Sequence, residues 1–568
     1  MSANTLIELM VEVAQRSEVG LEILDRREVA SWHAWSSIVE RAARVAGGLR
    51  ARGVAAGDRV ALILPTGADF VHGFFGVVWA GAVPVPLYPP LRLGCLDEYR
   101  EQTESMLRTA GANLVLSDRR ISSLLQDALR RANVHRGWET VGGLMGASTE
   151  ATRAAPSDLA LVQYSSGTTL RPKAVALEHR AILAQLDGLR RIWPTPRGAE
   201  HRGVSWLPLY HDMGLIGALL AALHHPGSLT LIPPELFVAR PAVWLRAIAR
   251  TRATISPAPD FAYALCCDRI QDEELDGVDL SCWQIALTGG EMVSARTLRR
   301  FAERFANWGF DPIALSPVYG LAEATLAVSF SSLDRPWQSR HFDRERLGRD
   351  GLALDSDGGL ELVSVGRPLL GFDLRIADAD GSSLPERRVG RILVRGPSML
   401  REYLDDAEAT AALRVGEWLD TGDLGVRIDE ELYVTGRAKD ILIHRGRNLA
   451  PEELERVADR VDGARPGCVA AVSSYSAALG REQIVLLVER RRKLGPSANA
   501  AIAARCREQL LASCGVEVDL VQMLEAGTLP RTSSGKIRRA EARRRLLAHQ
   551  LRPPGRVWQQ LIKAWLRR

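Results

Sequence analysis

The chain lacks the cysteine patterns that are typical of a disulfide framework or a zinc site. Its seven cysteines are spread over 568 residues without CxxC spacing. An odd number of cysteines, together with an N-terminus that lacks an export signal pattern, favours reduced thiols. We therefore expect a cytoplasmic protein in which Cys266, Cys267 and Cys282 are core thiols rather than metal ligands.

Long uninterrupted apolar runs are also missing. The apolar stretch 74–91 contains four prolines, and the stretch 213–232 is interrupted by His224, His225 and Pro226. Neither supplies the ~20 apolar residues that a membrane span needs. With 46% hydrophobic and 25% charged residues, the composition instead predicts a large globular protein without a membrane span.

The net charge is only +5, but residues 531–568 are rich in Arg and Lys and contain a single acid, Glu541. This basic segment is either a solvated helix face with a tail or a docking surface for an acidic partner. No aromatic-interleaved basic groove accompanies it, so we do not expect a nucleic acid partner.

A hydroxyl-rich segment with one glycine, YSSGTTLRPKAV, occupies residues 164–175. Its side-chain hydroxyls and glycine backbone suit the binding of phosphate oxygens, with Lys173 close behind. The spacing differs from a kinase-type phosphate loop, because Pro172 rather than glycine precedes the lysine. By itself the segment could equally be a polar surface turn. The residues concerned are Ser165, Ser166, Gly167, Thr168 and Thr169.

Near the other end of the chain, Lys536 follows a glycine in LPRTSSGKIRR, residues 529–539. Between the two segments lie Tyr319-Gly320-Leu321-Ala322-Glu323, then Asp420-Thr421-Gly422-Asp423, then Gly436-Arg437-Ala438-Lys439-Asp440. Tyrosine can stack on a base, a carboxylate can hold Mg2+ or ribose hydroxyls, and arginine can bind phosphate or ribose oxygens. Five such segments in this order are hard to obtain by chance.

In these motifs the chain resembles the adenylate-forming, or acyl-activating, ligase superfamily from about Leu62 through Lys536. The closest branch is the fatty acyl-AMP ligases. That branch is indicated by SWLPLYHDMGLIG at 205–217, by Pro259–Tyr263, by Arg445–Asn448 and by a segment between Phe330 and Gly366 that is similar to the branch's extra insertion.

The resemblance implies a mixed α/β fold with a large N-terminal body, 1–436, and a small mobile C-terminal α+β lid, 437–568, which ends in the basic tail. Short β-like runs with glycine-rich turns suggest a β-rich subdomain over about 363–435, preceded by the insertion at about 331–365. Lys439 matches the hinge position. A rotating lid would carry Lys536 out of the site so that a thiol can enter.

The resemblance also implies roles for individual residues. Lys536 bridges a substrate carboxylate and the α-phosphate of ATP, Glu323 holds Mg2+, and His211 lies where an amino-acid-activating relative carries an Asp. The residues that would bind the phosphates of ATP are Ser165–Thr169 and Lys173. Those that would bind its adenosine part are Gly290, Glu291, Tyr319, Gly320, Asp423 and Arg437.

We expect the acyl-adenylate of a fatty acid to be passed to the phosphopantetheine arm of an acyl carrier protein. The insertion would disfavour the alternative, an acyl-CoA ligase, and a catalytically silent binding protein is a third possibility. The chain departs from the superfamily pattern at four positions that remove no required group: Leu170, Ala174, Met292 and Asp260.

Overall fold

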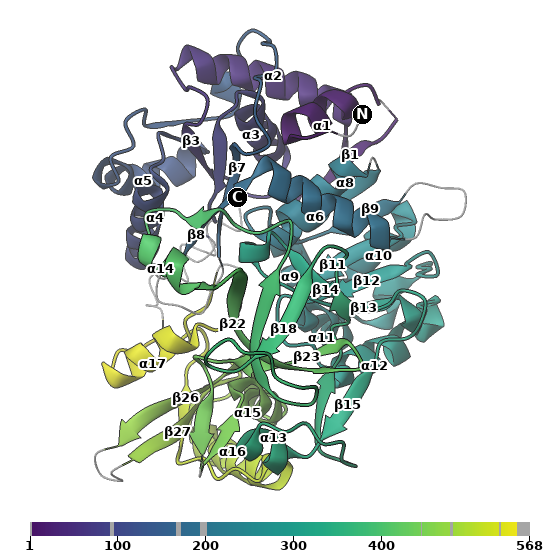
Figure 1. Cartoon of the computed structure of the whole chain (residues 1–568), viewed down its shortest axis with the longest axis vertical. Helices are drawn as coiled ribbons and strands as arrows, with labels where there is room; N and C mark the ends of the chain where they lie inside the picture. Colours follow the sequence, from purple (N-terminus) through teal and green to yellow (C-terminus); the bar gives the residue numbers. More distant parts are fainter. Residues whose placement is uncertain are drawn as a thin grey trace.

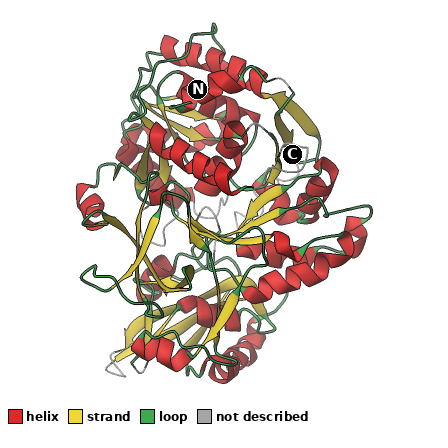
Figure 2. Cartoon of the chain, turned by 45° about the vertical axis from the view of Figure 1, so that its right-hand side comes forward, coloured by secondary structure: helices red, strands yellow, loops and turns green. Residues whose placement is uncertain are grey.

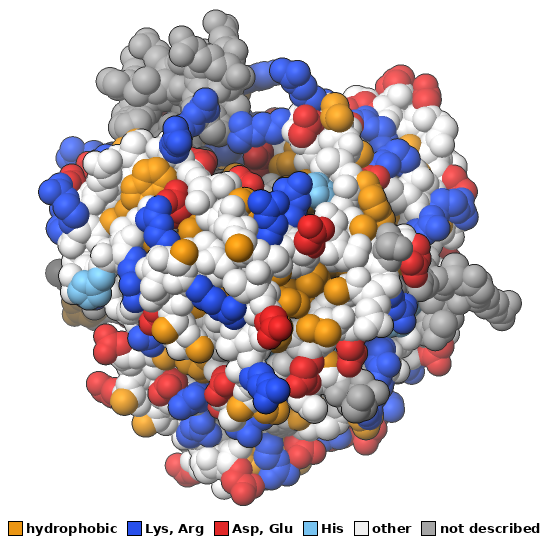
Figure 3. Space-filling model, turned by 90° about the horizontal axis from the view of Figure 1, so that it is seen from above, with side chains coloured by type: hydrophobic (Ala, Val, Ile, Leu, Met, Phe, Trp, Pro, Cys, Tyr) orange, Lys and Arg blue, Asp and Glu red, His pale blue; other side chains and the backbone are white. Residues whose placement is uncertain are grey.

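The computed structural model describes residues 3–16, 18–90, 96–165, 172–193, 201–225, 227–444, 446–476, 481–532 and 535–553. Helices and several sheets alternate along the chain, so the predicted mixed α/β class is confirmed (Figure 1). Within the described residues, no helix is long and apolar enough to cross a membrane. On the face seen in Figure 3, acidic and basic side chains are interspersed.

A nine-stranded sheet forms the centre of the N-terminal part. Its parallel strands include β9 (Arg202–Ser205), β10 (Ser228–Leu231), β11 (Ile255–Ala258), β12 (Ile285–Thr288) and β13 (Leu315–Gly320). The antiparallel strand β14 (Ala327–Phe330) follows β13. Helices α10 (Ala242–Thr251), α11 (Asp260–Arg269) and α12 (Ala295–Phe305) lie beside these strands (Figure 1), and Figure 2 shows helices packed around the sheets. The carboxyl ends of parallel strands meet at one edge, where ligands of α/β sheets usually bind.

A second, four-stranded parallel sheet has the order β4 (Val83–Pro86), β3 (Arg59–Ile63), β5 (Leu114–Ser117) and β6 (Trp138–Glu139). Helices α2 (Trp35–Ala51), α3 (Ala68–Trp79), α4 (Leu96–Ala110) and α5 (Arg119–Arg131) belong to the same region. Apolar residues at helical spacing bury one face of α2, whose fully buried members include Trp35 and Leu49.

A β-rich unit follows, with β18 (Asp373–Ala377), β19 (Gly390–Arg395), β22 (Trp418–Ile428), β21 (Arg414–Val415) and β23 (Glu431–Arg437). The pairing of β22 with β23 sets Asp423 opposite Arg437, although 14 positions separate them. Antiparallel pairing thus brings two of the predicted site residues side by side.

The insertion contains β15 (Ser339–Phe342), α13 (Arg344–Asp350) and β16 (Leu360–Val363). Its composition, rich in Arg and Asp, favours a surface element, but part of it contributes to a core. Phe342 and Leu362 are buried in a small core with Val426, Ile428 and Tyr433 of the β-rich unit. Because these two buried residues lie twenty positions apart, they form no periodic apolar pattern that would predict their burial from the sequence.

The C-terminal part has cores of its own. Its three-stranded sheet, β26 (Ala464–Ser476), β27 (Arg481–Arg490) and β28 (Leu520–Leu524), is accompanied by α15 (Pro451–Ala458), α16 (Asn499–Cys514) and α17 (Arg539–Leu547). Leu454, Leu486, Ile502 and Cys506 are fully buried in one of these cores. Separate cores are compatible with a lid beginning near residue 437, and that boundary stays our proposal.

Candidate active site

Lys536 reaches from the C-terminal part to the edge of the central sheet. Its amine donates a hydrogen bond to the carbonyl oxygen of Gly290, which follows β12. A tight turn presents the lysine: Thr532 N donates to the Lys536 carbonyl at 2.7 Å, and Lys536 N donates to Thr532 Oγ1 at 3.0 Å. Gly535 has φ +92°, which only glycine adopts readily. Ser533 and Ser534 lie outside the described residues.

The Lys536 amine is surrounded by carboxylates. Burial lowers its pKa, whereas the charges of Glu291, Asp212 and Asp423 act in the opposite direction and favour the ammonium form. Arg437 adds a second positive charge beside it. The structure therefore brings together residues that are widely separated in the sequence and places two positive charges, Lys536 and Arg437, among three carboxylates.

Asp423 is held on both oxygens. The Tyr319 hydroxyl donates to Asp423 Oδ2 at 2.7 Å, and Arg437 Nε donates to Asp423 Oδ1 at 3.0 Å. All three residues are more than half buried, and burial raises the pKa of Tyr319 well above its usual value. Asp423 is thus an acceptor fixed by two hydrogen bonds. Gly320 next to Tyr319 has no room for a side chain, because a Cβ would lie 1.8 Å from the Leu326 carbonyl oxygen.

Glu323 lies on the short turn before β14. The hydroxyl of Tyr403 donates to its Oε1 at 2.6 Å, and Leu400 N donates to its backbone carbonyl at 2.8 Å. Burial raises the pKa of the carboxyl group. A cation would relieve that penalty, and Mg2+ is commonly held by one or two carboxylates plus substrate phosphates. Glu323 therefore fits the predicted role of a Mg2+ ligand.

Lys173 and Ser165 flank the predicted phosphate segment. Ser165 N donates to the Lys173 carbonyl at 3.0 Å, and Lys173 N donates to Ser165 Oγ at 3.3 Å, which closes the base of the loop. The Lys173 amine forms an ion pair with Asp406 and lies 5.9 Å from the centre of the Tyr403 ring. It therefore neighbours Glu323 through Tyr403. Ser166, Gly167, Thr168, Thr169 and Leu170 lie outside the described residues.

His211 caps a short helical turn, with its Nδ1 2.6 Å from Asp212 Oδ1. Burial alone would raise the pKa of Asp212, but His211 and Lys536 lower it overall. Sequence reasoning missed Asp212, although it follows His211 in the LPLYHDMG motif. It also missed Tyr403 and Asp406, for which the sequence carries no comparable signal.

Glu291 and Asp260 form a pair of partly buried carboxyl groups beside Gly290. Phe261 N donates to Glu291 Oε1 at 2.8 Å, and Ser294 N donates to Asp260 Oδ1 at 3.0 Å. Burial and the neighbouring Glu291 raise the pKa of Asp260 to about 7. Here Glu291 contacts the α11 backbone and lies near Lys536, so its proposed contribution to adenine binding would be indirect.

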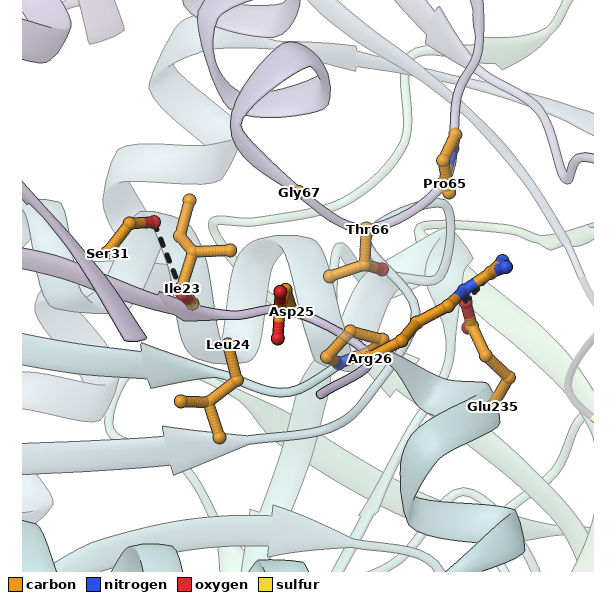
Figure 4. Close-up of a pocket in the computed structure, with 10 residues that line it drawn as sticks. Ile23, Leu24, Asp25, Arg26, Ser31, Pro65, Thr66, Gly67 and Glu235 are labelled. Atoms are coloured by element: carbon orange, nitrogen blue, oxygen red, sulfur yellow. Dashed lines mark hydrogen bonds and ion pairs between the residues drawn. The ribbon is translucent and has the colours of Figure 1, made fainter. Parts of the chain in front are cut away.

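A pocket with a volume of about 340 Å³ lies away from these residues (Figure 4). It is bounded by the strand β1 (Gly20–Leu24), by Pro65-Thr66-Gly67 and by the start of α9 (Pro234–Ala239), and an ion pair between Arg26 and Glu235 at 3.1 Å crosses its wall. None of the predicted site residues lines it. This pocket is therefore separate from the residues gathered around Lys536.

A fold of this kind, with a lysine from the C-terminal part inserted at the strand ends beside a Tyr–Asp–Arg cluster, defines an adenylate-forming ligase. The family model for AMP-binding enzymes matches residues 14–404, and the chain belongs to this family. A Caulobacter vibrioides protein provisionally named acyl-CoA synthetase is 37% identical over 549 residues, covering 95% of this chain and 94% of the relative.

Two further comparisons identify the branch. The Mycobacterium tuberculosis long-chain-fatty-acid–AMP ligase FadD23 is 31% identical over 535 residues, which is 89% of each chain. A solved structure from a study of fatty acyl-adenylate ligases of E. coli and L. pneumophila has a TM-score of 0.88 at 33% identity, and covers 95% of this chain and 97% of that one. The predicted resemblance to the fatty acyl-AMP ligases is confirmed.

Proposed function

We propose that the protein activates a fatty or related carboxylic acid with ATP, releases pyrophosphate and passes the acyl group to the phosphopantetheine thiol of an acyl carrier protein. The observation that carries the first step is the position of Lys536 at Gly290, amid Asp212, Glu291 and Asp423. The branch named in the comparisons supports a fatty acid as the substrate.

The first step joins two anions, so the site must supply positive charge and exclude water. The carboxylate oxygen attacks the α-phosphorus, a P–O bond forms, and the bond to the pyrophosphate oxygen breaks. Lys536 would neutralise oxygens of both partners. Asp423 and Arg437 would hold the ribose. Lys173 would leave its ion pair with Asp406 and bind the departing phosphates instead. Mg2+, bound by Glu323, would supply further charge neutralisation.

The choice of acceptor rests on the insertion. Arg344 of α13 forms an ion pair with Glu453 of α15, and a Cβ on Gly348 would lie 3.0 Å from the Asn448 carbonyl oxygen. This ion pair and the close approach of the two segments would stabilise the lid position in which Lys536 contacts Gly290. A contact that is made in only one lid position stabilises that position relative to the other. Such contacts would therefore oppose the lid rotation that free CoA requires. The provisional name of the Caulobacter relative keeps acyl-CoA formation as the second candidate.

Two assays test this function. Exchange of labelled pyrophosphate into ATP, measured across a panel of free acids, should show acid-dependent adenylate formation. Purified holo carrier protein and CoA should then be compared as acceptors of the same adenylate. Efficient acyl-CoA synthesis by the intact protein would promote the second candidate, and an absence of exchange with every acid would favour a silent binding protein.

A further inference from the structure

A small apolar cavity of about 40 Å³ lies between the central sheet and the π-helical turn Leu215–Leu220. Small residues form much of its wall: Gly203, Gly217, Ala218, Ala221 and Ala222. The volume corresponds to about three water-sized groups. A cavity of this size admits the end of a chain but not a long alkyl tail, unless side chains move.

One end of the cavity points toward the candidate active site. A Cβ on Gly217 would lie 3.8 Å from Met213 Cγ, and a Cβ on Gly290 would lie 3.3 Å from Met213 Cε. Met213 therefore stands between the cavity and the carbonyl group that binds Lys536. Because Pro257 lines the cavity near the carboxyl end of β11, the cavity is directed along the strands toward the adenylation site.

The other end lies at the start of the same parallel strands and is closed by polar rings. Trp193 and His201 meet with their ring centres 6.3 Å apart, and His201 and His225 with theirs 5.5 Å apart. His201 Nδ1 is 2.9 Å from Thr254 Oγ1, which orients that ring. All three rings line the cavity. A purely hydrocarbon tunnel would not end on such groups.

Trp193 adds a specific polar feature. Its Nε1 atom is buried and has no hydrogen-bond partner within the part of the chain that the structure describes. An indole N–H can only donate, and a buried donor left without an acceptor carries a desolvation penalty. A ligand that places an oxygen acceptor at the far end of the cavity would remove this penalty.

We infer that the preferred substrate is a short- to medium-chain carboxylic acid that carries an oxygen acceptor, such as a hydroxyl or carbonyl group, at its distal end. The carboxylate would lie at Lys536, the chain would pass Met213 and Gly217, and the distal oxygen would accept from Trp193 Nε1. The inference rests on the proposed function, because it names the substrate class of that same site.

The test compares straight-chain acids of increasing length with ω-hydroxy acids of the same lengths, using pyrophosphate exchange by the full-length protein. We expect exchange to decline for long chains, and the ω-hydroxy acid to exceed its methyl-ended counterpart in kcat/KM by about fivefold, the scale of one net hydrogen bond. Trp193→Phe keeps an aromatic ring but removes the donor, so the kcat/KM of the ω-hydroxy acid should fall to that of its methyl-ended counterpart.

A second variant tests the cavity itself. Ala222→Leu should shorten the longest accepted chain, whereas Ala504→Leu on the exposed face of α16 should not change it. Strong exchange with long methyl-ended acids, together with an unchanged preference in Trp193→Phe, would overturn the inference and leave the proposed function standing. An absence of exchange with every acid would overturn both.

Discussion

Lys536 donates a hydrogen bond to the carbonyl oxygen of Gly290 from a position 246 residues further along the chain. Gly290 has φ +75°, a conformation that glycine adopts without strain. The bond joins the C-terminal part to the end of a central strand. We therefore propose that the described arrangement is the one suited to adenylate formation rather than to thiol entry.

Replacing this lysine should stop the first half-reaction. Lys536→Ala should lower acyl-adenylate formation by about 10²-fold or more, the scale for the loss of one preorganised charge donor. ATP binding, measured by calorimetry, should persist because most nucleotide contacts are expected in the body. The exposed lysine of the same region, tested as Lys493→Ala, should leave the rate unchanged. Near-normal adenylation by the Lys536 variant would refute its assignment.

The metal requirement should depend on Glu323. Glu323→Gln keeps the acceptor for the Tyr403 hydroxyl but removes the negative charge, so half-maximal activity should need about tenfold more Mg2+. Tyr403→Phe is the matched control, because it removes the hydrogen bond and spares the carboxylate. A Mg2+ titration that is unchanged in the Gln variant would show that Glu323 has only a structural role.

Local patterns predicted much of the fold because helices and strands impose their own periods. The sequence suggests a helix over residues 35–52, and α2 spans Trp35–Ala51. The site motifs were also visible locally, since turn residues and polar groups stand together in each. What could not be predicted are partners supplied by distant segments: Tyr403 lies 80 positions from Glu323, and Asp406 lies 233 from Lys173. Such pairs depend on tertiary packing.

Ionisation of the Asp260 carboxyl group should lower the stability of the folded protein as the pH rises. Its pKa is raised from 3.8 to about 7, so the folded state holds this proton more tightly than the unfolded chain. Stability is therefore lost progressively between about pH 4 and pH 7. Asp260→Asn can still accept from Ser294 N and carries no charge. Its melting temperature should exceed that of the wild type by a few degrees at pH 8, with a smaller difference at pH 5.

The control for this effect is Asp268→Asn, a change at a partly exposed residue of the same helix. Its melting temperature relative to the wild type should vary little between pH 5 and pH 8. If the difference in melting temperature between Asp260→Asn and the wild type is instead the same at pH 5 and pH 8, the carboxyl group is ionised throughout this range. The proposed pairing with Glu291 is then wrong.

The insertion should control the choice of acceptor through Arg344. Arg344 of α13 forms an ion pair with the buried Glu453 of the C-terminal part, and we propose that this pair stabilises the described lid position. Arg344→Ala should increase acyl-CoA formation by about tenfold, equivalent to 1.4 kcal/mol of differential stabilisation, while adenylate formation stays near the wild-type rate. Arg346→Ala is the matched control, because Arg346 pairs with Asp350 inside the same helix. Product analysis with CoA in excess measures the acyl-CoA and the acyl-adenylate formed by each variant. If the two variants make equally little acyl-CoA, contact between insertion and lid does not select the acceptor, and another feature must exclude CoA.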